Sequence, residues 1–110
     1  MARTLVRGDI HLFPFERPDK RRPVVILTLG DVVNQLTSVT VAPISSSIRN
    51  ATSEVRLDID DGMKGPCVVK LHNLMTVEQS KLGPRVTSLS SNRMKEICVA
   101  LRFALDCDCD

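Results

Sequence analysis

Residues 7–29, RGDIHLFPFERPDKRRPVVILTL, decide the fold. The period of two expected of a half-buried strand is present over residues 9–15, where one set of positions, Ile10, Leu12 and Pro14, alternates with another, Asp9, His11, Phe13 and Phe15. The β-branched run over residues 23–27 predicts a second strand that is buried. Six of the seven residues 16–22 between them are charged. The stretch therefore predicts two strands joined by a tight charged loop.

Arg22 stands at the junction of this loop and the second strand, immediately before Pro23. A proline ring disfavours the helical region for the residue before it, so the backbone of Arg22 is biased to the extended region. The side chain of Arg22 is therefore expected to be aimed by the rigid strand rather than by the loop.

Further strands are predicted by apolar patterning over residues 38–44, 54–59, 66–71, 74–77 and 85–87. The clearest alternation has three apolar side chains expected to face the core, at Val55, Leu57 and Ile59. Asp61 and Gly62 form a strong turn signal. Pro43 cannot donate to a ladder, so the end of the third strand is expected at a sheet edge or at a bulge.

The chain changes period towards its end, and a helix is predicted from Ser90 or Ser91, either of which can cap it, to about Leu105. Its expected apolar side consists of Met94, Ile97, Cys98, Leu101, Ala104 and Leu105. Residues 106–110 form an acidic tail. The prediction is one domain over residues 1–110 with its core over about 7–105. Its class is mainly β (α+β), a small, partly open β-barrel of five to seven strands with a C-terminal helix.

Composition excludes several kinds of protein. There is no apolar run of 18 residues, and residues 1–7 lack the apolar centre of a signal peptide, so a cytoplasmic protein without a membrane span is expected. The only aromatic residues are three phenylalanines, which makes a base-stacking platform or a groove for proline-rich peptides a poor fit.

The charge distribution is more informative than the net charge of +2. Residues 1–56 hold eight Lys and Arg against five Asp and Glu, and residues 57–110 hold seven against eight. The surplus lies around the loop before Arg22, where a basic patch can attract phosphate. A solvated charged loop is the alternative explanation.

The four cysteines are expected to be reduced thiols, because no secretory signal is present. Cys107 and Cys109 form a C-x-C pair that could bind a soft metal, but no second cluster has zinc-ligand spacing. No metal and no cofactor are therefore predicted. The chain also lacks the common metalloprotease, serine-hydrolase and phosphate-loop motifs. For the two histidines, His11 and His72, structural or surface roles are expected before catalytic ones.

Several linked segments, in their order and spacing, resemble the MazF/PemK family of bacterial toxins. They are Arg7-Gly8-Asp9, the Arg22-Pro23 strand, the strand ending Pro43-Ile44-Ser45-Ser46, Cys67-Val68-Val69 with Thr76-Val77, Lys81-Leu82-Gly83 and the final helix. The resemblance covers about residues 7–105. It implies an SH3-like barrel that acts as a homodimer and as the toxin of a toxin–antitoxin pair.

The resemblance also implies an activity. The family cleaves single-stranded RNA at short preferred sequences without a metal, and mRNA, tRNA or rRNA is the substrate expected here. The ribose 2′-hydroxyl attacks the adjacent phosphorus and leaves a 2′,3′-cyclic phosphate and a 5′-hydroxyl. The reaction needs a base for the 2′-OH proton, donors for the phosphorane and an acid for the leaving oxygen. The expected protein partner is an antitoxin with a disordered segment that crosses the dimer groove.

Two residues match the family's catalytic positions. Arg22 matches the arginine before proline, and its planar fork of donors suits two phosphate oxygens. Ser45 aligns with a small hydroxyl residue, usually threonine, at the end of the third strand. Ser46 takes that place if the strand slips by one residue.

The remaining site residues follow less directly from the resemblance. The loop between the first two strands is shorter than in many members and lacks their Gly-Ser-Glu-Gln run. The hypotheses for the base, or for an RNA contact, are Glu16, Asp19 and His72. The hypotheses for RNA binding are Arg17, Lys20, Arg21, Ser46 and Lys70.

Two other functions stay open from the sequence. The same barrel serves toxins that bind and poison DNA gyrase, and function lies in the site rather than in the fold. A gyrase binder would depend on its C-terminal residues, which have no large aromatic anchor here. A barrel used only for binding is the third reading, and it predicts that Arg22→Ala leaves all activity intact.

Overall fold

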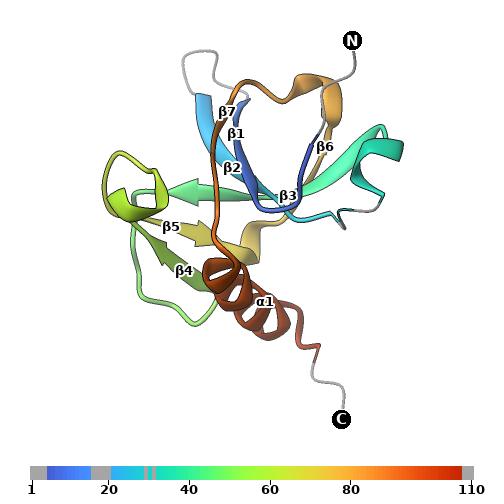
Figure 1. Ribbon diagram of the computed structural model, residues 1–110. Helices are drawn as coiled ribbons and strands as arrows, with labels where there is room; N and C mark the ends of the chain where they lie inside the picture. Colours follow the sequence, from blue (N-terminus) through green and yellow to red (C-terminus); the bar gives the residue numbers. More distant parts are fainter. Residues whose placement is uncertain (1–4, 16–20, 29, 31, 108–110) are drawn as a thin grey trace.

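A computed structural model of the chain describes residues 5–15, 21–28, 30 and 32–107. Within these residues, seven strands are followed by one α-helix (Figure 1). Their bounds are β1 Asp9–Pro14, β2 Arg21–Ile26, β3 Ser38–Ser45, β4 Glu54–Leu57, β5 Cys67–Lys70, β6 Met75–Glu78, β7 Arg85–Ser88 and α1 Ser91–Leu105. Short 3₁₀ turns lie between strands, at η1 Val33–Gln35, η2 Ile59–Asp61, η3 Leu71–Asn73 and η4 Gln79–Lys81.

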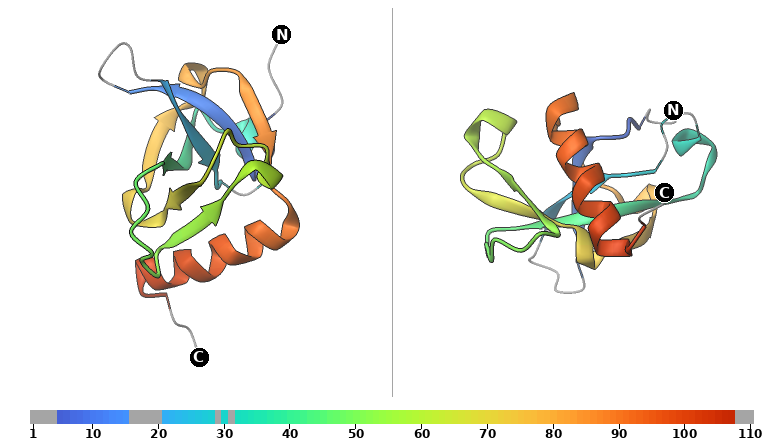
Figure 2. Two further views of the ribbon diagram at one scale, coloured as in Figure 1. Left: turned by 90° about the vertical axis from the view of Figure 1, so that its left-hand side faces the viewer. Right: turned by 90° about the horizontal axis from the view of Figure 1, so that it is seen from below.

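The strands form one curled antiparallel sheet in the order β4-β5-β3-β2-β1-β7, and β6 pairs with β3. The sheet bends round as an open half-barrel, and α1 lies against one side of it beside β4 (Figure 2). The prediction of a mainly β, partly open barrel with a C-terminal helix is confirmed. No helix in the described part of the chain has both the length and the hydropathy needed to cross a membrane.

β2 is the centre of the structure because it is buried on both faces. Val25 belongs to a core cluster beneath α1, which includes Ile97 and Ala100. Val24 and Ile26 belong to a second cluster on the opposite face of the sheet. This confirms the prediction that the β-branched run forms a buried strand.

β1 differs from the half-buried strand that its alternation predicted, because its polar positions are buried as well. Asp9 and His11 are 5% and 2% exposed. Strands β2 and β7 flank β1 and supply partners. The Asp9 carboxylate accepts a hydrogen bond from Ser88 Oγ at 2.5 Å, and His11 Nδ1 donates to the carbonyl oxygen of Gly83 at 2.9 Å. These bonds offset part of the loss of water around the two polar side chains, whereas the buried His11 Nε2 has no hydrogen-bond partner among the described residues.

The expectation of an edge or bulge at Pro43 was wrong. β3 is a central strand that pairs with β2 along one side, and Pro43 lies opposite Val24. On its other side β3 pairs with β6 up to Val41 and with β5 from Ile44. Pro43 therefore lies between two successive partners, where a missing N–H removes no ladder hydrogen bond.

Three expected inward-facing positions were also wrong. β4 ends at Leu57, and Ile59 is 70% exposed, because Asp58 begins a capped 3₁₀ turn instead of continuing the strand. On α1 the buried residues are Ile97 and Ala100, whereas Cys98 and Leu105 are exposed. The predicted helix bounds and its Ser90 cap, which accepts from the Arg93 N–H, are confirmed.

Candidate active site

A groove of about 940 Å³ lies where β2 begins, where β3 ends and beside the turn between β4 and β5. In Figure 1 the head of the β3 arrow reaches this turn. The polar and charged side chains that line the groove are Arg21, Arg22, Ser45, Ser46, Ser47 and Lys64. No Asp or Glu is among the described lining residues. The groove is therefore suited to an anion.

The two arginines extend from the exposed start of β2. Arg21 and Arg22 are exposed, and the strand becomes fully buried from Val24 onwards. Their backbone is held by pairing with β1, where Arg22 lies opposite Phe13. Because a buried strand fixes the main chain, only side-chain freedom remains for Arg22 to lose on binding a ligand.

Ser45 reaches the same groove from the last position of β3. Its backbone pairs with Val68 of β5, and its Oγ accepts a hydrogen bond from the Ser47 N–H at 3.1 Å. This bond orients the oxygen and uses it only as an acceptor, so the hydroxyl proton stays available to a ligand. The structure thus brings Arg21, Arg22, Ser45 and Ser46 together from two strands.

Lys70, the last residue of β5, and His72, in the 3₁₀ turn that follows, are not among the residues that line the groove. Lys70 Nζ lies 2.7 Å from Glu54 Oε2, and this hydrogen bond holds the pKa of Glu54 below its usual value. His72 Nδ1 is hydrogen-bonded to Ser53 Oγ. The structure therefore does not bring either residue to the groove, and neither enters the site proposed below.

Other predicted residues lie outside the part of the chain that the structure describes. They are Glu16, Arg17, Asp19 and Lys20, which precede β2, and Cys109 of the C-x-C pair. Within the described residues, no three His, Cys, Asp or Glu side chains gather in the manner of a metal site.

The turn between β4 and β5, residues 58–66, lines the groove together with the start of β2 and the end of β3. We call it the anchored turn, because three contacts fix it. Asp58 and Asp61 form a capping box: the Asp60 N–H donates to Asp58 Oδ1, and the Asp58 N–H donates to Asp61 Oδ2, each at 2.9 Å. Gly62 has φ +90° and packs against Thr87 of β7.

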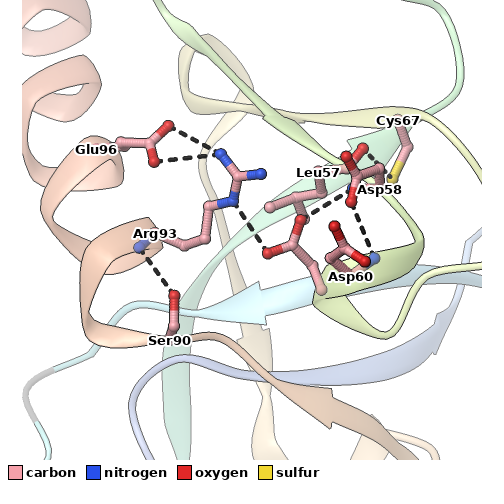
Figure 3. A network of polar contacts seen from close by, with 8 residues as sticks. Leu57, Asp58, Asp60, Cys67, Ser90, Arg93 and Glu96 are labelled. Carbon is pink, nitrogen blue, oxygen red and sulfur yellow. Dashed lines mark hydrogen bonds and ion pairs between the residues drawn. The ribbon is translucent and has the colours of Figure 1, made fainter.

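The third contact joins the anchored turn to α1 (Figure 3). Arg93 Nε donates to Asp61 Oδ1 at 3.0 Å, and Arg93 Nη1 donates to Glu96 at 3.1 and 3.2 Å. Burial is the largest single influence on Asp61 and opposes its ionisation. The hydrogen bond from Arg93, the hydrogen bond from the Asp58 N–H and the positive charge of Arg93 together outweigh it, so the pKa of Asp61 lies below its usual value. The turn is thus tied to the first turns of the helix.

Comparison with known proteins identifies the family. A family described as PemK-like, MazF-like toxin of type II toxin–antitoxin system matches residues 6–105. The chain belongs to this family. The resemblance drawn from the sequence is confirmed over almost the whole length.

Individual relatives agree with this. Endoribonuclease MazF3 of Mycobacterium tuberculosis is 38% identical over 90 residues, which cover 82% of this chain and 87% of that protein. Probable endoribonuclease MazF2 of the same species is 31% identical over 91 residues, which cover 82% of this chain and 89% of that protein. The solved structure of the Mycobacterium tuberculosis toxin MazF-mt6 has a TM-score of 0.84 and 36% identity, and it covers 92% of this chain and 99% of that one.

Sequence reasoning missed one cation of this groove. Residues 60–65 were recognised only as a turn, yet Lys64 is exposed and lines the groove. The Asp61-Gly62 signal located the turn but not the surface that it faces. Cys67, at the base of the same turn, is buried, and burial together with the nearby Asp61 and Asp58 raises the pKa of its thiol. Cys67 is therefore an inert lining residue.

The ion pair of the anchored turn predicts an acid-dependent stability. Because the pKa of Asp61 is depressed in the folded state, its stabilising effect is complete above the unfolded-state pKa of about 3.9. The effect is lost as pH falls through the lower folded-state value. Asp61→Asn is expected to lower the free energy of unfolding at pH 7 by about 1 kcal/mol and to flatten its fall below about pH 5.

Urea unfolding midpoints at several pH values measure this difference. Asp60→Asn is the matched control, since Asp60 gives the capping box its backbone N–H. Parallel pH profiles of wild type and Asp61→Asn would contradict the role given to the ion pair.

Proposed function

We propose that this chain, an endoribonuclease toxin of the MazF/PemK family, cleaves single-stranded RNA without a metal ion. Arg22 and Ser45 act on the scissile phosphate. The observation that supports this proposal is the meeting of these two side chains, from the start of β2 and the end of β3, in one groove without a described carboxylate.

The proposed reaction is an in-line displacement at phosphorus. The ribose 2′-oxygen loses its proton to a base and forms a bond to the adjacent phosphorus, and the bond from phosphorus to the 5′-oxygen then breaks. The 5′-oxygen takes up a proton, so the products are a 2′,3′-cyclic phosphate and a 5′-hydroxyl. Negative charge accumulates on the two non-bridging oxygens at the midpoint, and preorganised donors that meet this charge lower the barrier.

Arg22 and Ser45 have complementary parts in this reaction. The guanidinium of Arg22 offers two parallel N–H donors and a permanent positive charge to the non-bridging oxygens. The Ser45 hydroxyl, whose oxygen already accepts from the Ser47 N–H, donates its proton to one of the same oxygens. For the base, Glu16 and Asp19 remain the hypotheses from the sequence.

The expected partners and cellular location follow from the family. A cognate antitoxin is the expected protein partner, because the family consists of toxins of type II toxin–antitoxin systems. A related endoribonuclease from a mycobacterial species was solved in complex with its cognate antitoxin. We propose further that the chain acts as a homodimer in the cytoplasm and that its substrate is mRNA, tRNA or rRNA. The gyrase-binding and binding-only alternatives are not favoured, because the relatives are endoribonucleases.

The test incubates the purified protein with a long single-stranded RNA in the presence of EDTA. We expect discrete cuts with 5′-hydroxyl ends, which polynucleotide kinase labels without prior phosphatase treatment. Ser45→Ala is expected to slow cleavage about tenfold, the usual scale for removal of a hydrogen bond to a charged group. Ser45→Thr retains the hydroxyl and is expected to retain most activity. Absence of cuts by folded protein, or cuts with 5′-phosphate ends, would overturn the proposed reaction.

A further inference from the structure

The groove has a third cation that the proposed reaction does not use. Lys64 is exposed and lines the groove from the anchored turn, whereas Arg21 and Arg22 line it from β2. Ion pairs among the described residues engage Lys70, Arg85 and Arg93 with carboxylates, but they do not include these three groove cations. Three positive charges therefore face the same space from two walls.

A polyanion that lies along such a groove meets more than one of these charges. Arg22 has the planar fork that suits one phosphate bidentately, whereas the ammonium of Lys64 is a flexible point charge that binds phosphate without a fixed geometry. Lys64 also comes from a different segment of the chain, the anchored turn rather than β2, so it is available to a different part of the bound strand.

We propose that Lys64 binds a phosphate of the RNA next to the scissile one, and that Arg93 is a positioning residue that holds Lys64 in place. This inference rests on the proposed function. It assigns the anchored turn to substrate binding and leaves the chemical step to Arg22 and Ser45.

The positioning role follows from the contacts of the turn. Arg93 is not among the groove-lining residues, but it donates to Asp61, three residues before Lys64 (Figure 3). Glu96 holds the other side of the same guanidinium at 3.1 and 3.2 Å. Removal of the Arg93 side chain breaks the link between the turn and α1, whereas the capping box and the Gly62 packing remain. The turn that carries Lys64 would then be held by two contacts instead of three, so the position of Lys64 would be less well fixed.

The experiment uses the full-length protein and an RNA that contains a cut site mapped with wild type. Lys64→Met is expected to raise KM about threefold to tenfold with little change in kcat, because an exposed phosphate contact contributes to binding alone. The log–log dependence of kcat/KM on salt is expected to become shallower by about 0.7, the change expected when a protein neutralises one phosphate fewer on a single strand. Lys95→Met, which removes an exposed charge from α1, is the matched control and should resemble wild type.

A double-mutant cycle separates positioning from general damage. Arg93→Gln is expected to raise KM in wild type but not in the Lys64→Met background, and Arg93→Lys should retain part of the effect. If Lys64→Met and Lys95→Met behave alike in KM and salt dependence, the inference is overturned while the proposed function stands. If wild type itself leaves the RNA intact, the proposed function fails and this inference fails with it.

Discussion

Arg22→Ala should reduce the rate of RNA cleavage by about two to three orders of magnitude, the usual reduction when one preorganised donor to a developing oxyanion is removed. The reason is geometric, because Arg22 extends from a strand that is fully buried from Val24 onwards and therefore holds its main chain in place. The free energy of unfolding should change by no more than about 0.5 kcal/mol, since the side chain is exposed. Single-turnover cleavage of a mapped RNA site measures the change in rate.

Two further variants test whether the change in rate is caused by loss of the guanidinium group of Arg22. Arg22→Lys keeps the charge but not the planar fork, and we expect it to recover only part of the rate. Arg56→Ala removes another exposed arginine, on β4 and away from the groove, and should cut like wild type. Equal rates for Arg22→Ala and Arg56→Ala would remove Arg22 from the reaction and favour a barrel that only binds.

The second large effect is expected at Gly62, which has φ +90° and ψ 11°. A side chain there is strained by the backbone, and an added Cβ would lie 2.5 Å from Thr87 Oγ1 and 2.9 Å from Thr87 Cβ. Gly62→Ala should therefore lower the free energy of unfolding by about 1–3 kcal/mol. It should also displace the anchored turn and slow cleavage under conditions where the protein is still folded.

Denaturant midpoints and cleavage rates test this together. Gly30→Ala is the control, because an added Cβ at Gly30 meets no atom within 4 Å and its φ is not positive. Thr87→Ala added to Gly62→Ala should restore part of the stability, since it removes the closest contact but not the backbone strain. A Gly62→Ala protein as stable and as active as the Gly30→Ala protein would show that the turn is not a fixed wall.

Sequence predicted those parts of the fold that local chemistry determines. The run from Val24 to Ile26 has no polar position, so it could only be a buried strand, and it is one. The helix carries its own Ser90 cap and a 3.6-residue period, and its bounds were correct. Ile59 was misplaced because alternation was followed past Asp58, although Asp58 and Asp61 at capping-box spacing already signalled a break.

The wrong prediction at Pro43 and the failure to predict Lys64 as a groove residue both come from contacts between segments far apart in the chain. Whether a proline can be tolerated in β3 depends on which strands flank it, and β5 and β6 both come much later in the chain. Likewise, Lys64 becomes a groove residue only when the turn after β4 packs against β7. Lys70 was assigned to RNA because its partner Glu54 lies 16 residues away, and their meeting across β4 and β5 is not visible in the sequence.

The division of β2 into an exposed start and a buried remainder has a consequence for how such toxins diverge. Val24, Val25 and Ile26 are constrained by the core clusters on the two faces of the sheet, so they hold Arg22 in place whatever precedes it. Exposed residues of the groove such as Arg21 and Lys64 are under no such constraint from packing in the clusters. If the proposed function holds, mutations at these exposed positions can change which RNA is preferred while Arg22 and the core beneath it are retained, so a new specificity can arise without loss of the fold.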